Sequence, residues 1–286
     1  MEATGTKRKV LDFVEKVTYA SATKVYPNSK GLYDFIVANR LTSPEKLKVI
    51  GNGSSNGIDT NFFSLDQVPL EKQTELKKEW NITPNDFVFV FVGRLVGDKG
   101  INELVQAFQN LETRNQESET LISSPKSLVS SKIPKLLLVG PLESELDPLK
   151  EETLKEITTN PNIIRVGFQK DVRPFFAIAN ALVFPSYREG FPNVVMQAGA
   201  MELPSIVSDI NGCNEIIIEG ENGTIIPVKD SDAVYNAMLR FIEDEPYYEK
   251  LKANARKMIQ DRYEQQVVWD ALLEEYNTLL KEQERR

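Results

Sequence analysis

The strongest constraint on the fold is a series of short, mainly apolar runs that alternate with helical segments between residues 86 and 243. The runs lie at residues 86–93, 135–140, 163–167, 181–184, 205–208 and 224–227. Short apolar runs of this kind are typical of parallel strands that are buried on both faces. The segments between them have helical spacing, at about 101–111, 144–157, 172–179, 193–201, 213–219 and 231–243. This alternation predicts an α/β fold with a doubly wound parallel sheet.

The loop that follows residues 181–184 has the composition of an anion site. Pro185 ends the apolar run, and the polar turn after it carries Arg188 and Glu189. Pro192 lies where the first turn of the next helix is expected, a position that tolerates proline well. A helix N-terminus offers free N–H groups and a partial positive charge, which suit phosphate. In a parallel sheet this loop lies on the edge where ligands bind.

A second loop of the same kind follows residues 86–93. It contains Arg94 and Lys99 among three glycines, and the two cations suit a diphosphate. Taken alone, these cations fit a solvated loop equally well; the loop that carries Glu189 favours the ligand-binding interpretation. Gln197 lies two helical turns after Glu189, about 12 Å along a helix axis, so both residues fit one elongated ligand. By itself, Gln197 fits an ordinary helix position.

Composition excludes several classes of function. The net charge of −8, without a basic arm, argues against general nucleic-acid binding. The sequence has no histidine, so it contains no Ser-His-Asp triad and no histidine-based metal site. Its one cysteine, Cys213, excludes an intrachain disulfide and fits a reducing compartment. The apolar runs have strand length, so we expect a cytoplasmic protein, with peripheral contact at the inner membrane face left open.

One short acidic motif has two interpretations. Asp230-Ser231-Asp232 matches the Asp-x-Asp pattern of some metal sites, but it directly precedes an amphipathic helix. Asp and Ser are preferred at helix N-caps, so we interpret the motif as a cap and predict no metal. Cys213 has no base nearby in the sequence and is expected to be a small buried residue in a turn.

The flanking regions are less regular. Helices are expected at 7–20 and 30–38, short strands at 24–26 and 47–50, and helical structure from residue 247 onward. Residues 52–63 are rich in turn formers and predict a hinge or linker. Residues 113–134 are rich in Ser, Glu and Gln without a period, which indicates a surface insertion.

Three motifs together resemble a known family. They are Gly93-Arg94…Lys99-Gly100, Val166-Gly167-Phe168 and Pro185-Ser186…Glu189-Gly190-Phe191…Gln197. In order and spacing they resemble the nucleotide-binding domain of the retaining GT-B glycosyltransferases of family 4 (group 1), over about residues 49–243. The resemblance implies two Rossmann-like domains that face each other across a cleft, with the donor held mainly by the C-terminal one. Residues 1–50 would then be a remnant of the N-terminal acceptor domain. Residues 51–262 would be the nucleotide-sugar-binding domain, and 263–286 a C-terminal helix that packs back towards the N-terminal domain.

The resemblance also implies roles for single residues. The catalytic residues would be Arg94 and Lys99, on the donor diphosphate, and Glu189, on donor sugar hydroxyls. Further donor-binding residues would be Gly93, Gly167, Phe168, Gly190, Phe191, Pro192, Asn193 and Gln197. Family members usually carry Glu at the position of Gln197, where it binds the ribose hydroxyls, and an amide lacks the charge assistance of a carboxylate.

The implied activity is retaining transfer of a sugar from a nucleotide-diphosphate sugar to a sugar or lipid-linked acceptor in cell-surface polysaccharide or glycolipid synthesis. No cofactor and no metal are expected. In this family the acceptor site and a glycine-rich loop belong to an N-terminal domain that the sequence lacks. We therefore expect this chain alone to bind the donor weakly without transferring it, and a separate N-terminal domain is an expected partner. One alternative is a non-catalytic donor-binding subunit of a split enzyme. An unrelated Rossmann-type nucleotide-binding protein is disfavoured, because no Gly-x-Gly-x-x-Gly follows the first buried strand.

Overall fold

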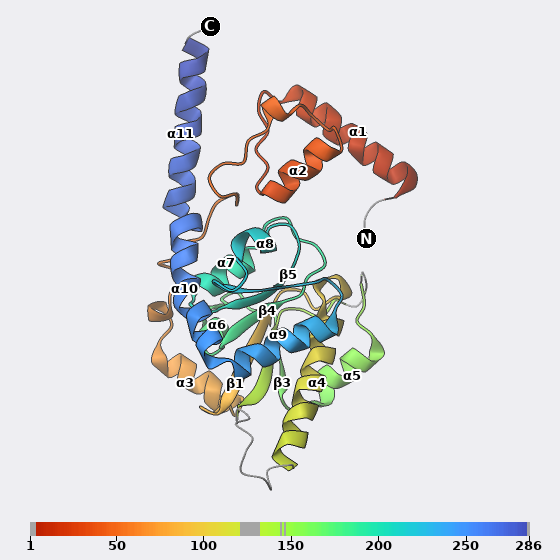
Figure 1. The fold of residues 1–286 in the computed structure, drawn as a ribbon, viewed down its shortest axis with the longest axis vertical. Coiled ribbons are helices and arrows are strands. Elements are labelled where there is room, and N and C mark those ends of the chain that lie inside the picture. The colour runs from red at the N-terminus through yellow and green to blue at the C-terminus, as the bar shows by residue number, and fades with distance from the viewer. Residues whose placement is uncertain (1–3, 121–131, 144, 146, 285–286) are drawn as a thin grey trace. The chain divides into compact units, whose positions relative to one another are not determined.

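The fold was analysed in a computed structural model that describes residues 4–120, 132–143, 145 and 147–284. The chain divides into two compact units (Figure 1). One comprises Met1–Gly57 and Arg262–Arg286, and the other comprises Ile58–Asp261. The first division falls inside the turn-rich segment 52–63.

The larger unit is built on one six-stranded sheet in which every neighbouring pair of strands is parallel. The strands are β1 (Asp86–Val92), β2 (Ile133–Val139), β3 (Ile163–Gly167), β4 (Ala181–Phe184), β5 (Ser205–Ser208) and β6 (Gly223–Ile226). Their order across the sheet is β3-β2-β1-β4-β5-β6. All six strands lie where the apolar runs predicted them, so the prediction of a doubly wound, Rossmann-like α/β fold is confirmed.

Helices cover the sheet and explain the apolar composition of its strands. They are α3 (Leu70–Glu79), α4 (Ile101–Thr120), α5 (Glu151–Thr159), α6 (Arg173–Ala177), α7 (Asn193–Ala200), α8 (Cys213–Ile216), α9 (Ser231–Glu243) and α10 (Glu245–Tyr263), with short 3₁₀ turns η2 (Leu65–Gln67) and η3 (Gly97–Lys99). Helix α4 contacts β2, α5 and α9, whereas α7 contacts β4, β5 and α8 (Figure 1). Right-handed crossovers that leave the centre of the sheet in opposite directions place these two groups on opposite faces. The side chains of Phe89, Val90 and Phe91 are therefore fully buried.

The strand order creates a switch point between β1 and β4. From β1 the chain continues outward to β2 and β3, and it then returns to place β4 on the other side of β1. Phe89 pairs with Ala181, and Val90 pairs with Leu182. The loops after β1 and β4 lead away from this point in opposite directions, which is where open α/β sheets bind ligands.

Several element boundaries differ from the sequence prediction, most of all those of α4 and α5. Helix α4, expected to end at residue 111, continues to Thr120, because Glu, Arg and Gln are good helix formers even without an apolar period. β2 starts at Ile133, so both ends of the expected insertion 113–134 belong to regular elements, and residues 121–131 lie outside the described residues. Helix α5 begins at Glu151 and not near 144, because Pro148 disfavours helix in the residue before it and two glutamates favour the first turn at 151–152.

The smaller unit contains α1 (Gly5–Ser21), α2 (Lys30–Ala38), the 3₁₀ turn η1 (Pro44–Lys46) and α11 (Gln265–Glu284). The two short strands expected at 24–26 and 47–50 are wrong: the structure has a single parallel bridge between Val25 and Leu47. Pro27 has no N–H to extend a ladder after Val25. A small apolar core of Ile36, Leu41 and Leu47 lies beside this bridge.

A buried carboxylate joins α11 to the early part of the chain in this unit. Tyr26 Oη donates a hydrogen bond to Glu275 Oε1 over 3.0 Å, and Lys48 forms an ion pair with Glu275 Oε2. The Glu275 side chain is only 6% exposed. Hydrogen bonding by Lys48 lowers the pKa of Glu275, with a second contribution from Tyr26, against the opposing effect of burial.

Candidate functional site

The centre of the candidate site is an ion pair between the two loops at the switch point. Lys99 lies in the loop after β1 and Glu189 lies in the loop after β4, ninety positions apart in the chain. The Lys99 ammonium contacts Glu189 Oε1, and each side chain is 17% exposed. The structure therefore brings together two of the residues that the sequence singled out, at the carboxyl ends of adjacent strands.

The close approach of these loops depends on Gly100. Its φ of +71° lies in the left-handed region, and a Cβ added to it would come within 2.1 Å of Pro185 O. Next to this contact, Tyr187 N donates a hydrogen bond to Asp98 O over 2.9 Å, and this bond joins the two loops. A glycine and a backbone hydrogen bond thus fix the distance between Lys99 and Glu189.

Ser186 lies inside the loop, beneath Glu189. It is fully buried, and its hydroxyl donates a 2.9 Å hydrogen bond to Glu189 Oε1. That oxygen is the one that Lys99 contacts, so both partners of the carboxylate use the same atom.

A third segment, after β5, supports the loop from the other side. Asn211 Nδ2 donates to Gly190 O over 2.8 Å. Gly212 has φ +75°, and a Cβ there would come within 2.6 Å of the same carbonyl oxygen. Cys213 follows as the first residue of α8 and is buried, as expected. Burial, and secondarily the charge of Glu189, raises the pKa of the Cys213 thiol, which keeps it neutral.

The start of α7 completes this corner of the site. Pro192 is the N-cap residue and Asn193 the first helical residue, where the predicted helix 193–201 begins. Gly190 and Phe191 precede it, against the turn at Gly212. Gln197 lies on the second turn of α7, half-buried, and its side chain makes no hydrogen bond with any part of the chain that the structure describes.

Arg94 forms an ion pair with Glu143, a residue that the sequence analysis does not single out. The Arg94 side chain is 47% exposed, and its Nη1 lies 3.0 Å from Glu143 Oε2, in the loop after β2. Arg188, in the same loop as Glu189, has a side chain that is 55% exposed and lies 3.5 Å from Asp98 Oδ2. The described contacts thus pair Lys99 with Glu189, and Arg94 with Glu143.

The remaining predicted residues lie at the ends of β1 and β3. Gly93 N donates to Val139 O, and Gly140 N donates to Gly167 O, each over 2.9 Å, so the ends of β1, β2 and β3 are linked in a row. Phe168 follows Gly167 and is 68% exposed. Their roles in ligand binding stay predictions.

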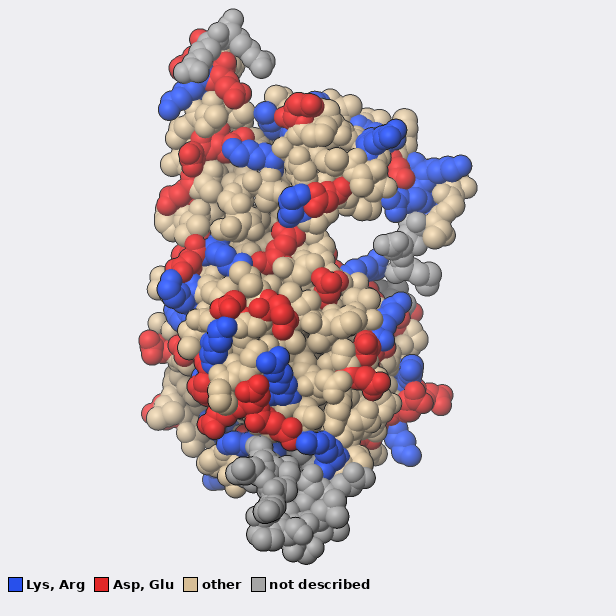
Figure 2. Space-filling view, in the orientation of Figure 1, with Lys and Arg blue, Asp and Glu red and all other residues tan. Residues whose placement is uncertain are grey.

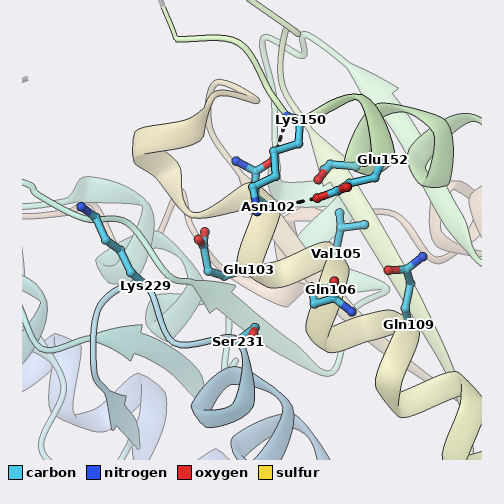
Figure 3. Close-up of a pocket in the computed structure, with 10 residues that line it drawn as sticks. Asn102, Glu103, Val105, Gln106, Gln109, Lys150, Glu152, Lys229 and Ser231 are labelled. Atoms are coloured by element: carbon cyan, nitrogen blue, oxygen red, sulfur yellow. Dashed lines mark hydrogen bonds and ion pairs between the residues drawn. The ribbon is translucent and has the colours of Figure 1, made fainter.

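A polar pocket of about 180 Å³ lies beside the Glu189 loop, between α4, the start of α5 and the start of α9 (Figure 3). Its lining includes Glu103 and Lys229, which both contact Tyr187. Tyr187 Oη donates to Glu103 over 2.7 Å, and the Lys229 ammonium lies 4.9 Å from the centre of the Tyr187 ring. Burial, then the Glu103 hydrogen bond, raises the pKa of Tyr187 and keeps it protonated.

Sequence reasoning did not identify several of these supporting residues. Ser186 stands out in the sequence only as part of a motif, and Asn211 and Gly212 only as the turn residues directly before Cys213. Tyr187 and Glu143 were not singled out at all. The Ser-x-x-Glu spacing of Ser186 and Glu189 was the one available signal, because a serine three residues before a loop carboxylate lies within reach of it.

The acidic motif before α9 serves as a cap. Asp230 is the N-cap residue, and its Oδ1 accepts a 2.8 Å hydrogen bond from Ala233 N. The interpretation of Asp230-Ser231-Asp232 as a helix start is therefore confirmed.

The face of the molecule that Figure 2 shows is of mixed charge. Acidic and basic side chains are intermixed over this face. Within the described part of the chain, no helix combines the length and the apolar character needed to cross a bilayer.

Comparison with known proteins gives consistent matches. The family described as glycosyl transferases group 1 matches residues 72–258. The capsular polysaccharide biosynthesis glycosyltransferase CapM of Staphylococcus aureus is 34% identical over 280 residues, which cover 98% of this chain and 68% of CapM. The UDP-Gal:alpha-D-GlcNAc-diphosphoundecaprenol alpha-1,3-galactosyltransferase of Escherichia coli is 25% identical over 244 residues, which cover 84% of this chain and 57% of that enzyme.

A solved structure shows the same fold. The crystal structure of Anabaena Alr3699/HepE in complex with UDP and glucose superimposes with a TM-score of 0.76 at 21% identity. The match covers 95% of this chain and 67% of HepE. The family match extends over most of the sheet-bearing unit, and CapM is similar along nearly the whole chain. The protein belongs to the group 1 glycosyl transferases.

Proposed function

We propose that this chain holds the donor of a retaining, family 4 glycosyltransferase that uses a nucleotide-diphosphate sugar. The observation that carries the proposal is the Lys99–Glu189 ion pair at the β1–β4 switch point. A cation for the diphosphate and a carboxylate for sugar hydroxyls are thereby held side by side. Cell-surface polysaccharide synthesis is the proposed setting, because CapM is named for capsular polysaccharide biosynthesis. The name of the E. coli galactosyltransferase contains a diphosphoundecaprenol-linked sugar, which supports a lipid-linked acceptor as one candidate.

The diphosphate is proposed to bind Arg94, Lys99 and the backbone N–H groups from Phe191 to Asn193. Both cations would exchange a carboxylate partner for phosphate oxygens, which form charge-assisted hydrogen bonds of comparable strength. As the bond to the sugar breaks, negative charge builds on the leaving diphosphate. Fixed cations and the N-terminus of α7 stabilise that charge without reorganisation.

The rest of the donor is proposed to lie along α7 and the end of β3. Glu189 would accept hydrogen bonds from sugar hydroxyls, Gln197 from the ribose, and Gly167-Phe168 would cover the base. HepE was solved with UDP and glucose, which makes uridine nucleotides the first probes to test. Retention would follow if the leaving diphosphate helps to deprotonate a sugar or lipid-linked acceptor on the same face of the donor sugar. The acceptor domain, of which residues 1–50 would be a part, would bind that acceptor, at the cytoplasmic face of the membrane if it is lipid-linked.

The test is a thermal-shift screen of UDP, GDP, their sugar conjugates, NAD and NADP against the full chain. We expect at least one nucleoside diphosphate to raise the melting temperature, and both Arg94→Ala and Lys99→Ala to abolish the shift. The control is Lys72→Ala, which removes a surface ion pair with Glu75 inside α3, outside both loops. This variant should keep the shift. Binding that persists in both site variants, or a response only to NAD(P), would overturn the proposal.

A further inference from the structure

The two oxygens of the Glu189 carboxylate have different numbers of described contacts. Lys99 and Ser186 both contact Oε1, whereas none of the described contacts of Glu189 uses Oε2. One oxygen is therefore fixed by the protein, and the other remains available to accept a hydrogen bond.

The Ser186 hydroxyl has one proton and three acceptors within reach. Glu189 Oε1 lies at 2.9 Å, Arg188 O at 3.2 Å and Asp98 O at 3.4 Å. The carboxylate is both the nearest acceptor and the charged one, so it takes the proton. Ser186 is fully buried beneath the loop, which leaves its hydroxyl little freedom to turn elsewhere.

The two partners of Oε1 differ once a diphosphate is present. Under the proposed function, the Lys99 ammonium contacts the phosphates and therefore donates less of its hydrogen bonding to Glu189. Ser186 has no other role in the site and keeps its bond. It then becomes the contact that holds the carboxylate in one orientation.

We propose that Ser186 is a positioning residue that anchors Glu189 through Oε1 and so reserves Oε2 for a hydroxyl of the donor sugar. The inference rests on the proposed function. It differs from that function in assigning an orientation and an anchor to the carboxylate. Because Glu189 is proposed to contact the sugar and not the nucleotide, loss of Ser186 weakens binding of the sugar part of the donor and leaves nucleotide binding intact.

The chain offers a matched control for this test. Ser208 is also a fully buried serine at the carboxyl end of a neighbouring strand, β5. Its Oγ has no hydrogen-bond partner among the residues that the structure describes. Ser208→Ala thus removes a buried hydroxyl at an equivalent depth without removing a contact to Glu189.

The experiment measures the affinities of the full chain by calorimetry for UDP, UDP-glucose, UDP-galactose and UDP-N-acetylglucosamine, and for GDP and GDP-mannose. The readout is the ratio between the affinity for each sugar nucleotide and that for its own nucleoside diphosphate. For the sugar with the highest ratio, we expect Ser186→Ala to lower the ratio about tenfold, because the unanchored carboxylate no longer makes its charge-assisted hydrogen bond with the sugar hydroxyl. The nucleoside diphosphate itself should bind Ser186→Ala within about twofold of the wild type, and Ser208→Ala should match the wild type throughout.

The outcomes separate the two proposals. If the wild type binds no nucleotide, the proposed function fails. If it binds nucleotides but no sugar raises the affinity, or if Ser186→Ala keeps the sugar's contribution, the positioning role of Ser186 is overturned. Ser186→Cys preserves the shape with a weaker donor and should give an intermediate ratio. If Ser186→Ala does not fold, Ser186→Cys takes its place in the measurement.

Discussion

At the scale of single residues, the site is controlled by which carboxylate each cation contacts. Lys99 and Glu189 are both largely buried, so the loss of either partner leaves an uncompensated charge in a poorly hydrated place. Arg94 and Glu143 are much more exposed, and their pairing is correspondingly weak. A diphosphate that enters the site therefore displaces Glu143 from Arg94 more easily than it displaces Glu189 from Lys99.

Gln197 is a residue where a substitution towards the family pattern should help. Its half-buried side chain has no hydrogen-bond partner among the described residues, and a carboxylate there would bind the ribose hydroxyls with charge assistance. We expect Gln197→Glu to keep or raise the thermal shift caused by the best nucleotide. Ala substitution at the same position should lower it. A smaller shift in Gln197→Glu than in the wild type would show that position 197 does not face the ribose.

At the scale of elements, the distance between the loops after β1 and β4 depends on backbone that only glycine permits. Gly100 and Gly220 share a φ of +71°, but only Gly100 meets other atoms, because nothing lies within 4 Å of a Cβ at Gly220. Gly220→Ala should destabilise the protein by about 1 kcal/mol, the cost of a left-handed alanine. Gly100→Ala must in addition move the loop away from Pro185. It should therefore cost clearly more and weaken nucleotide binding.

The two glycine variants are compared by denaturant unfolding and by calorimetry with the best nucleotide. Equal losses of stability, with unchanged nucleotide affinity in both, would show that the contact between Gly100 and Pro185 does not set the site. The two glycines share the same φ, so the difference between the variants reports mainly the contact with Pro185.

The attachment of α11 within the smaller unit should depend on pH. The pKa of Glu275 is lowered below its ordinary value of 4.5, mainly by its hydrogen bond with Lys48. A carboxylate of this kind stabilises the folded state fully above its unfolded pKa and loses that contribution as the pH falls through its folded pKa. We expect the protection factors of the α11 amides, which compare exchange with the intrinsic rate at the same pH, to fall below about pH 4.5 in the wild type. In Glu275→Gln the protection factors should be lower at neutral pH, and their acid-induced fall should be smaller.

The sequence predicted elements well wherever a single pattern determined them. The six strands followed from apolar runs buried on both faces, and Asp230 was recognised as a cap from its place before α9. Prediction failed where local composition and tertiary context disagreed. Residues 113–120 lack an apolar period yet continue α4, and residues 24–26 and 47–50 look like strands but form one bridge.

The same reason limited prediction of the site. Strand-end loops place Lys99 and Glu189 on one edge of any parallel sheet, so their proximity follows from the fold class. The Asn211 side chain reaches Gly190 only because β5 lies next to β4. In the same way, Arg94 contacts Glu143 only because β2 lies next to β1. Strand order and side-chain rotamers of this kind are not encoded in any one segment.

At the scale of the whole molecule, the residues proposed to bind the donor all belong to one of the two units. They lie between Gly93 and Gln197, within Ile58–Asp261. The smaller unit is held by its own core around Ile36 and by Glu275. Ligand binding and acid should therefore act on different parts of the chain.

This separation predicts that nucleotide binding and acid change the unfolding of the chain independently, each in a different unit. A nucleotide at one hundred times its dissociation constant stabilises the state that binds it by about 2.7 kcal/mol. We expect this gain in hydrogen-exchange protection at the amides of β1, β4 and α7, and none at those of α1 or α2. Lowering the pH to 4 without nucleotide should instead reduce the hydrogen-exchange protection of α11 before that of the sheet. Equal protection of both units by the nucleotide would mean that the chain unfolds as one cooperative body. The donor would then be linked to the smaller unit as well as to the sheet.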